Sequence, residues 1–302
     1  MKKLYYAITI FVLFELSLRL IFGLGDPLLY YEDSNYEYFN KPNQNIKRFG
    51  SEIKTNEYGM RSEKVNHEKI NILKIGDSVI HGGTLTSNKD LSSNLLTEYL
   101  KDSEIYNSDI LNISTGSWGP DNAFQYIKKH GDFDSPLFIL VFSSHDYFDT
   151  MNFEKIVDNH KSYPSKKPTS AIFELFDRYF FPRFNINFGE KKESKINSLL
   201  VNNNKVKNTG WEEFINYCKE NEIGLWVVLH PTKKEIKNKN YSETGQKILQ
   251  LLEENEIKTF NELKLGTKLD FYRDDIHYNE KGQRFLAEIL KEDLIYFLKT
   301  ID

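Results

Sequence analysis

The chain has 302 residues, and its 40 Lys and Arg against 44 Asp and Glu give a formal net charge of -4. Hydrophobic residues make up 39% and aromatic residues 14%, which is enough for a sizeable core and excludes disorder along the whole chain. The near balance of charge argues against a nucleic-acid partner, which normally needs a basic excess. The single cysteine, Cys218, excludes an intramolecular disulfide framework and a cysteine-rich zinc site.

Residues 1–25 have the pattern of a membrane anchor. Two lysines precede an apolar run that extends to residue 24, and as a helix this run would be ~31 Å long, about the thickness of the hydrocarbon layer. Glu15 and Arg19 interrupt the run, but residues four apart share a helix face and can pair. Because positive residues before a span favour a cytoplasmic N-terminus, we predict an uncleaved, single-pass anchor in the bacterial inner membrane with the remaining chain periplasmic. The alternatives are a cleaved signal peptide, which would give a secreted protein, and a buried core helix.

Residues 26–67 form a second segment, which differs from the first in composition. Tyr30, Tyr31, Tyr36, Tyr38 and Phe39 stand among many polar residues with no sustained period. Flexible linkers avoid aromatic residues, so we predict an extended lead-in that packs on the following domain.

From residue 68 to the end, residue 302, short apolar runs alternate with amphipathic stretches. Continuous apolar runs such as 137–142 and 224–229 are typical of strands buried on both faces, as parallel sheets require. The alternation therefore predicts an α/β domain with a doubly wound, mostly parallel sheet. The strands are expected at 70–75, 110–113, 137–142, 224–229 and 257–260, and the helices at 91–101, 121–130, 211–221, 242–255 and 280–299. Residues 150–209 are rich in Lys and Asn and are expected to be an insertion, with a helical patch at 171–180.

Polar residues follow four of the predicted strands, where ligands of open parallel sheets bind. The first strand ends in Gly76-Asp77-Ser78 and the second is followed by Gly116; the third ends in Ser144-His145-Asp146 and the fourth in His230. Asp274 and His277 come just before the last helix. Serine, histidine and acid gathered in one crevice indicate nucleophilic catalysis.

Each residue type fits a role in that chemistry. Ser78 would be the nucleophile, with its N–H facing a developing oxyanion. A serine hydroxyl needs a base, for which His277 is the candidate, and Asp274 can orient the imidazole. The N–H of Gly116 can approach a substrate oxygen closely. In the simpler alternatives Ser78 only caps a helix, Gly116 is a turn glycine, and Asp275 replaces Asp274.

These blocks resemble, in order, those of the SGNH/GDSL hydrolase superfamily, and the stretch 277–282 is similar to the family's entry into its last helix. The resemblance covers roughly residues 68–300 and implies a three-layer α/β/α, flavodoxin-like fold. By likeness, Ser78, His277 and Asp274 form the triad, and Ser78 and Gly116 supply oxyanion N–H groups. The anchor and the stretch 56–61 are more loosely similar to membrane-anchored bacterial members linked to surface-polysaccharide acylation.

The third block departs from the family's pattern. The family has an asparagine whose amide donates to the oxyanion, whereas this chain has His145. An imidazole N–H can also donate, so we expect His145 in the oxyanion hole. His145, Asp146 and His230 are expected to bind substrate, with a loop-holding role as the alternative for Asp146. Asp77 is expected to accept loop N–H groups.

Two rival chemistries receive less support. Asp77, His81, His145 and other histidines superficially resemble a metallophosphoesterase set, but His81 comes four residues after Asp77, followed by two glycines, which is not the spacing of that family. The chain has neither a Gly-x-Gly-x-x-Gly motif after the first strand nor a Gly-Lys-Ser/Thr motif, so nucleotide binding is not indicated. We expect no metal and no cofactor, because a serine triad needs none.

The sequence thus predicts a serine esterase acting on a small acyl ester, with an acetyl group on a carbohydrate as the expected substrate. Two alternatives stay open. The same acyl-enzyme could pass its acyl group to a sugar hydroxyl of a surface polysaccharide, which would make the protein an O-acetyltransferase. Alternatively, the chain could be a non-catalytic, glycan-binding relic of the fold.

Overall fold

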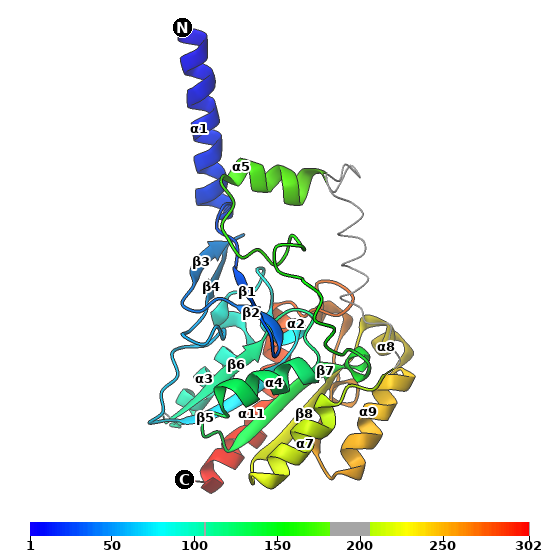
Figure 1. Cartoon of the computed structure of the whole chain (residues 1–302). Helices are drawn as coiled ribbons and strands as arrows, with labels where there is room; N and C mark the ends of the chain where they lie inside the picture. Colours follow the sequence, from blue (N-terminus) through cyan, green and yellow to red (C-terminus); the bar gives the residue numbers. More distant parts are fainter. Residues whose placement is uncertain (106, 182–205, 302) are drawn as a thin grey trace.

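A computed structural model describes residues 1–105, 107–181 and 206–301. Helix α1 (Lys2–Phe22) projects from the rest of the molecule (Figure 1). Nearly all of its apolar side chains are exposed, and it is long and apolar enough to be a membrane span or a signal sequence. It ends at Gly23, whose φ of 68° is the left-handed conformation that glycine adopts readily.

The lead-in is built from two antiparallel hairpins, a pairing of its extended strands that was not predicted from the sequence. The hairpins comprise β1 (Tyr30–Asp33) with β2 (Glu37–Asn40), and β3 (Asn45–Arg48) with β4 (Ser51–Lys54). Its aromatic side chains do pack on the domain: Tyr36 and Phe39 are buried against Trp118 and Tyr126.

Five parallel strands form the central sheet, in the order β6-β5-β7-β8-β9. Numbered along the chain from β5 this is 2-1-3-4-5, the flavodoxin-like order, in which ligands bind where the winding reverses. Here that point lies between β5 and β7, the strands that lead to Ser78 and His145. The strands are β5 (Ile70–Gly76), β6 (Ser108–Ser114), β7 (Leu137–Ser143), β8 (Gly224–His230) and β9 (Lys258–Asn261).

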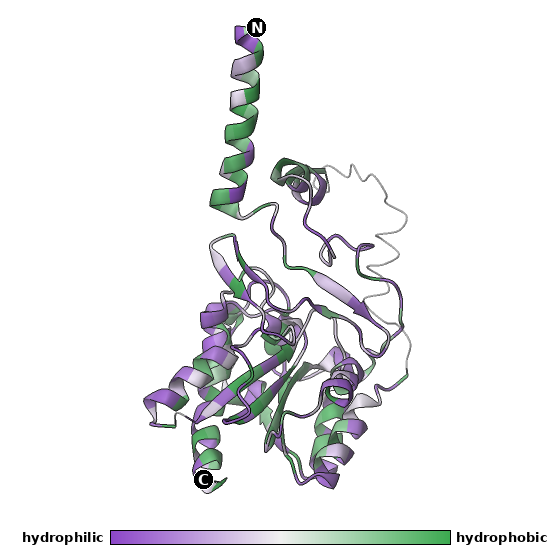
Figure 2. Ribbon diagram, turned by 60° about the vertical axis from the view of Figure 1, so that its left-hand side comes forward, coloured by the Kyte–Doolittle hydropathy of each residue, from purple (hydrophilic) through white to green (hydrophobic). Residues whose placement is uncertain are grey.

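Helices cover both faces of the sheet, which confirms the three-layer α/β/α fold class (Figures 1 and 2). One face packs on α4 (Pro120–His130), α7 (Gly210–Glu220) and α9 (Glu243–Glu254). The other packs on α3 (Ser92–Asp102) and α11 (Glu280–Ile301). The lead-in hairpins share the first of these two cores.

Short helices occupy the connections. They are α2 (Ser78–His81), η1 (Asn88–Asp90), η2 (Ser144–Tyr147), α5 (Ala171–Glu174), η3 (Leu175–Phe180), α8 (Lys233–Asn238), α10 (Glu262–Leu265) and η5 (Leu269–Phe271). In the predicted insertion at 150–209 the expected helical patch is present as α5 and η3, while residues 182–205 lie outside the described part.

Candidate active site

Ser78 stands at the first position of α2, directly after β5. The helix is capped by Asp77, whose Oδ1 accepts a hydrogen bond from Val79 N at 2.8 Å. The Ser78 hydroxyl is therefore not needed as a cap. Gly76 allows the strand to pass close to β7, because an added Cβ would lie 2.3 Å from the carbonyl oxygen of Val141.

A line of hydrogen bonds joins Ser78, His277 and Asp274. Ser78 Oγ lies 2.8 Å from His277 Nε2, and His277 Nδ1 lies 2.8 Å from Asp274 Oδ2. With its proton on Nδ1, the imidazole donates to Asp274 and accepts from the serine, the arrangement in which it can act as a base. The Asp274 and His277 side chains are 51% and 38% exposed, so solvent and substrate can reach them.

Asp274 is held as a carboxylate acceptor by its own loop. Its Oδ1 accepts from the backbone N–H groups of Ile276 at 3.0 Å and His277 at 2.8 Å. Partial burial opposes ionisation, but these two N–H groups and the His277 imidazole keep the pKa of Asp274 below its usual range. Asp274, and not Asp275, is the acid that faces His277.

An antiparallel bridge closes this loop at its base. Tyr272 pairs with Tyr278, and Arg273 N donates to His277 O at 2.9 Å. The Arg273 side chain donates to the carbonyl oxygen of Tyr278 at 2.8 Å and also to Thr86, in the segment that follows α2. The loop that carries His277 is thereby tied to the loop after the serine.

His230 does not line the site, which corrects its prediction as a substrate-binding residue. It is fully buried, with Nδ1 2.8 Å from Glu262 Oε2 and Nε2 2.7 Å from the carbonyl oxygen of Ile276. Burial alone would lower the pKa of His230, but the carboxylate of Glu262 and the Ile276 carbonyl raise it. Tyr278 Oη also donates to Glu262, at 2.7 Å. His230 therefore supports the loop that carries His277.

Asp146 is also inaccessible to a substrate, which corrects its predicted binding role in favour of the loop-holding one. Its side chain is 0% exposed, and Oδ2 accepts from Ser143 N at 2.6 Å at the start of η2. Burial, and next the charge of Asp77, raise the pKa of Asp146 well above its usual range. His145, in contrast, is 48% exposed, with Nε2 3.5 Å from Asp146 Oδ1. Its ring is therefore accessible to a ligand.

Gly116 lies in the turn after β6. Its backbone is not in the left-handed region, so the reason for glycine is space: an added Cβ would lie 2.6 Å from the hydroxyl oxygen of Tyr163. The carbonyl oxygen of Gly116 accepts from Tyr38 Oη at 2.8 Å. Two tyrosines therefore fix the turn whose N–H is the predicted oxyanion donor.

The rival metal set is only partly brought together. His81 is buried with Nε2 3.1 Å from Asn40 Oδ1. His230 and His277 make the hydrogen bonds described above. Within the described residues, one ligand atom each of Asp77, His145 and Asp146 lie within 4.8 Å of one another. One oxygen of each carboxylate accepts a backbone N–H group, which gives both aspartates a role in the structure of their loops.

A buried polar network under α2 has no counterpart in the sequence predictions. Lys74 on β5 is 0% exposed and donates to Ser92, whose Oγ lies 2.8 Å from Gln283 Oε1. Gln283 Nε2 in turn donates to the carbonyl oxygen of Val79 at 2.6 Å. Burial lowers the pKa of Lys74 to about 7. The available signal was a lysine between two apolar residues, Leu73 and Ile75, of a predicted strand.

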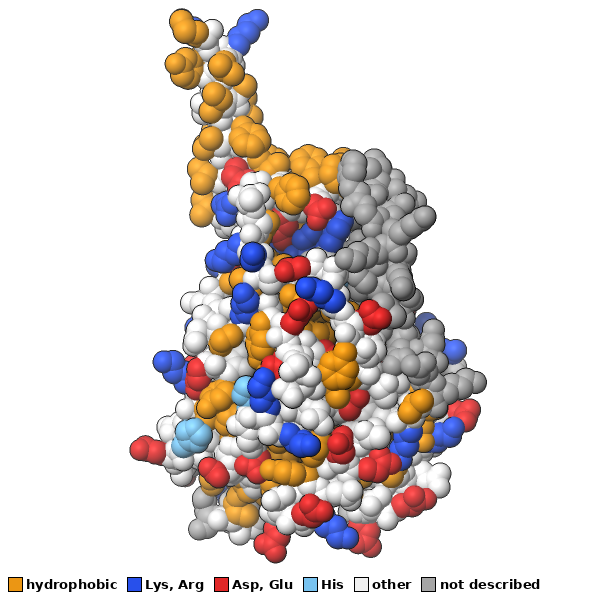
Figure 3. Space-filling model, viewed as in Figure 1, with side chains coloured by type: hydrophobic (Ala, Val, Ile, Leu, Met, Phe, Trp, Pro, Cys, Tyr) orange, Lys and Arg blue, Asp and Glu red, His pale blue; other side chains and the backbone are white. Residues whose placement is uncertain are grey.

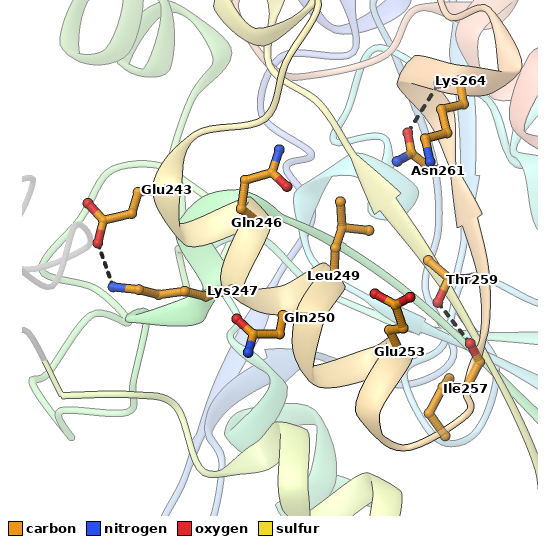
Figure 4. Close-up of a pocket in the computed structure, with 10 residues that line it drawn as sticks. All are labelled: Glu243, Gln246, Lys247, Leu249, Gln250, Glu253, Ile257, Thr259, Asn261 and Lys264. Carbon is orange, nitrogen blue, oxygen red and sulfur yellow. Dashed lines mark hydrogen bonds and ion pairs between the residues drawn. The ribbon is translucent and has the colours of Figure 1, made fainter.

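A hollow of about 730 Å³ lies elsewhere, between α9 and the edge strand β9 (Figure 4). Its lining is polar and includes an ion pair between Lys247 and Glu243 at 2.6 Å. None of the predicted site residues lines it.

Comparisons with protein-family models and with curated proteins found no match. Among solved structures, the chain is similar to a lipase/acylhydrolase from Enterococcus faecalis, with 10% identity, 75% of this chain and 95% of that chain covered, and a TM-score of 0.44. A G-D-S-L lipolytic protein from Veillonella parvula DSM 2008 has 11% identity, coverages of 74% and 97%, and a TM-score of 0.39. A carbohydrate acetylesterase family member from Sinorhizobium meliloti has 11% identity, coverages of 76% and 99%, and a TM-score of 0.42.

These structures are of the classes that the sequence resemblance names.

Proposed function

We propose that this protein is a serine esterase that hydrolyses small acyl esters, with Ser78, His277 and Asp274 as its triad. The observation that carries the proposal is the unbroken line from Ser78 Oγ to the Asp274 carboxylate, with both steps at 2.8 Å. A serine at the start of a helix, a histidine accepting its proton and an acid fixing the histidine tautomer are the parts that acyl transfer requires.

The proposed reaction has two halves. Ser78 Oγ attacks the ester carbonyl carbon while His277 Nε2 takes the hydroxyl proton, and the same proton then passes to the departing alkoxide. Water, deprotonated by His277, next attacks the acyl carbon; the bond to Ser78 Oγ breaks, His277 returns the proton to Ser78 Oγ, and the carboxylic acid leaves. The oxyanion formed in each half would accept from the N–H groups of Ser78 and Gly116 and from the His145 imidazole.

We propose an acetyl group on a carbohydrate as the substrate. The exposure of the Asp274 and His277 side chains suits a small acyl group that is presented on a bulky polar carrier. The buried apolar side chains on the two faces of the sheet belong to two packed cores.

A fluorophosphonate probe tests the nucleophile. We expect it to label the wild-type protein on Ser78, and we expect Ser78→Ala to lose both labelling and turnover of p-nitrophenyl acetate while keeping its circular dichroism. Ser103→Ala is the matched control, because Ser103 ends α3 away from the site, and it should behave as wild type. Absence of labelling in folded wild-type protein would support the non-catalytic, glycan-binding alternative.

Acyl transfer is the second candidate, and the open triad favours it, since a sugar hydroxyl could replace water at an exposed His277. Incubation of the protein with an acetyl donor and candidate oligosaccharides, followed by mass spectrometry, separates the two. Acetylated sugar would establish transfer, whereas free acetate alone would dismiss it.

We further propose that α1 anchors the protein in the inner membrane with the catalytic domain outside the cytoplasm. The exposure of its apolar side chains supports an anchor over a core helix. An alkaline phosphatase fusion after residue 66 should be active, and the full chain should resist carbonate extraction. An inactive fusion would place the domain in the cytoplasm, and an active but carbonate-soluble protein would support a cleaved signal.

A further inference from the structure

A short helix lies across the base of α1. Residues 171–180 comprise α5 and η3 and are called the lateral helix below; they extend sideways from the lower end of α1 (Figure 1). Its first turn is fixed to α1 directly: Glu15 Oε1 accepts from Ala171 N at 2.8 Å and Glu15 Oε2 accepts from Ile172 N at 2.9 Å. Ala171 also packs with Leu18 and Leu24.

The inner side of the lateral helix is polar and tightly held. Glu174 is buried in an ion pair with Arg48 of the β3–β4 hairpin, and its Oε2 accepts from Gly25 N at 2.6 Å. Tyr179 Oη lies 3.0 Å from Arg48 Nη2. These bonds fix the rotation of the lateral helix about its own axis.

Its outer side is a stripe of phenylalanines. Phe173, Phe176 and Phe180 are 60%, 36% and 44% exposed, and their spacing of three and four residues places them on one helix face. Apolar side chains continue from α1 onto the upper side of the lateral helix, with charged side chains directly below (Figure 3). Exposed apolar patches rimmed by charge mark interaction surfaces.

The position of the lateral helix along α1 indicates the partner. It is attached at Glu15 and Leu18, four to seven residues before α1 ends at Phe22, which is ~6–10 Å along the helix axis. Interfacial amphipathic helices bury their apolar face to about 5–10 Å at the boundary between headgroups and acyl chains. If α1 crosses a bilayer and leaves it near Phe22, the phenylalanine stripe lies at that depth in the same leaflet.

We propose that the lateral helix is a second membrane contact, which inserts Phe173, Phe176 and Phe180 into the headgroup–acyl boundary of the leaflet that α1 leaves. The proposal rests on the proposed anchoring by α1. It also accounts for two charges in the apolar segment: Glu15 is paired with Arg19 at 2.7 Å and accepts the first N–H groups of the lateral helix. A single span leaves a domain free to rotate about its axis, whereas two contacts fix its orientation to the membrane.

Tryptophan fluorescence of the full chain in phosphatidylcholine vesicles tests the proposal. The native Trp118, Trp211 and Trp226 are buried, so a new tryptophan on the surface can be followed above their background. We expect the tryptophan of Phe176→Trp to emit at shorter wavelength than a solvent-exposed tryptophan. We also expect it to be quenched by lipids brominated near the carbonyl end of the acyl chain. Tyr296→Trp, at a site 72% exposed on α11, is the control and should be quenched only by aqueous iodide.

A third reporter, Phe11→Trp in α1, separates failure of this proposal from failure of the anchor. Bromolipid quenching at position 11 with iodide quenching at position 176 would leave the anchor standing and overturn the membrane contact. Quenching by bromolipid at neither position would refute both. A blue-shifted Trp at position 176 that is quenched by neither agent would mean that protein covers the stripe, and would also overturn the proposal.

Discussion

Asp274→Asn is the sharpest test of the proposed triad, because the loop dictates which atom of the new side chain faces His277. Oδ1 of Asp274 accepts two backbone N–H groups, from Ile276 and His277, and only the amide oxygen of an asparagine can replace it there. The amide nitrogen must then face His277 Nδ1, at the position of the oxygen that now lies 2.8 Å away. A donor at that position requires an unprotonated Nδ1, so the ring proton moves to Nε2 and the imidazole can no longer accept from Ser78.

The corresponding aspartate-to-asparagine change in a serine protease lowers kcat by about 10⁴. Here the Asp274 side chain is 51% exposed, so water can compete for Nδ1, and we expect a loss of about 10³ to 10⁴, or roughly 4–5 kcal/mol in the activation barrier.

The assay is the turnover of p-nitrophenyl acetate at pH 7.5, with urea unfolding to verify that stability is retained. Asp275→Asn is the matched control, since Asp275 is exposed on the same loop and does not contact His277. It should retain nearly full activity. A loss of less than tenfold in Asp274→Asn, or equal losses in the two variants, would refute the assignment of Asp274 as the orienting acid.

Three further changes test other parts of the site. His145→Ala should lower kcat by about 10²–10³ through loss of an oxyanion donor, with recovery in His145→Asn; equal rates in both variants would contradict the role. His230→Gln should lower kcat by up to about 100-fold with little change in KM, because the Ile276 carbonyl loses its firm support and His277 shifts; a change in KM alone would point to substrate contact. Lys74→Met should flatten the pH dependence of stability. Since the folded pKa of Lys74, about 7, lies below the unfolded value of 10.5, this residue binds more protons in the unfolded chain between these pH values, and its contribution to wild-type stability should rise by up to about 5 kcal/mol from pH 7 to 10.5. Urea titrations that give the variant the same slope would contradict this.

The strands of the sheet could be predicted because burial on both faces leaves a local trace. The runs 137–142 and 224–229 are apolar throughout, and the observed strands extend each by a single residue. The hairpins were missed because their turns carry unusual residues: Phe49 and Gly50 adopt φ of 49° and 83°, where Asn-Gly is the pattern expected of such turns. Helix α8 was missed although Thr232 and Glu235 form a capping box at its start.

The candidate site, too, could be predicted only in part. The residues that directly follow strands could be placed near one another, because the topology of a parallel sheet brings all strand ends to one edge. Their burial could not be predicted. Asp146 and His230 stand at strand ends as Ser78 does, yet their side chains face inward. Asp146 accepts a backbone N–H group of its own loop, and His230 pairs with Glu262, which lies in a different element. Glu262, the partner of His230, carries no motif that would identify it.

The lead-in connects the proposed anchor to the proposed site through direct bonds. At its outer end, Phe49 N donates to the carbonyl oxygen of Phe22 at 3.0 Å, where α1 ends. At its inner end, Asn40 Nδ2 donates to the carbonyl oxygen of Ser114 at 3.2 Å, and Asn40 Oδ1 lies 3.1 Å from His81 Nε2 in α2. The segment therefore contacts both the end of α1 and the short helix that presents the serine. Because its aromatic side chains are part of the core that covers the sheet, the lead-in joins the end of α1 to the proposed site through packed structure.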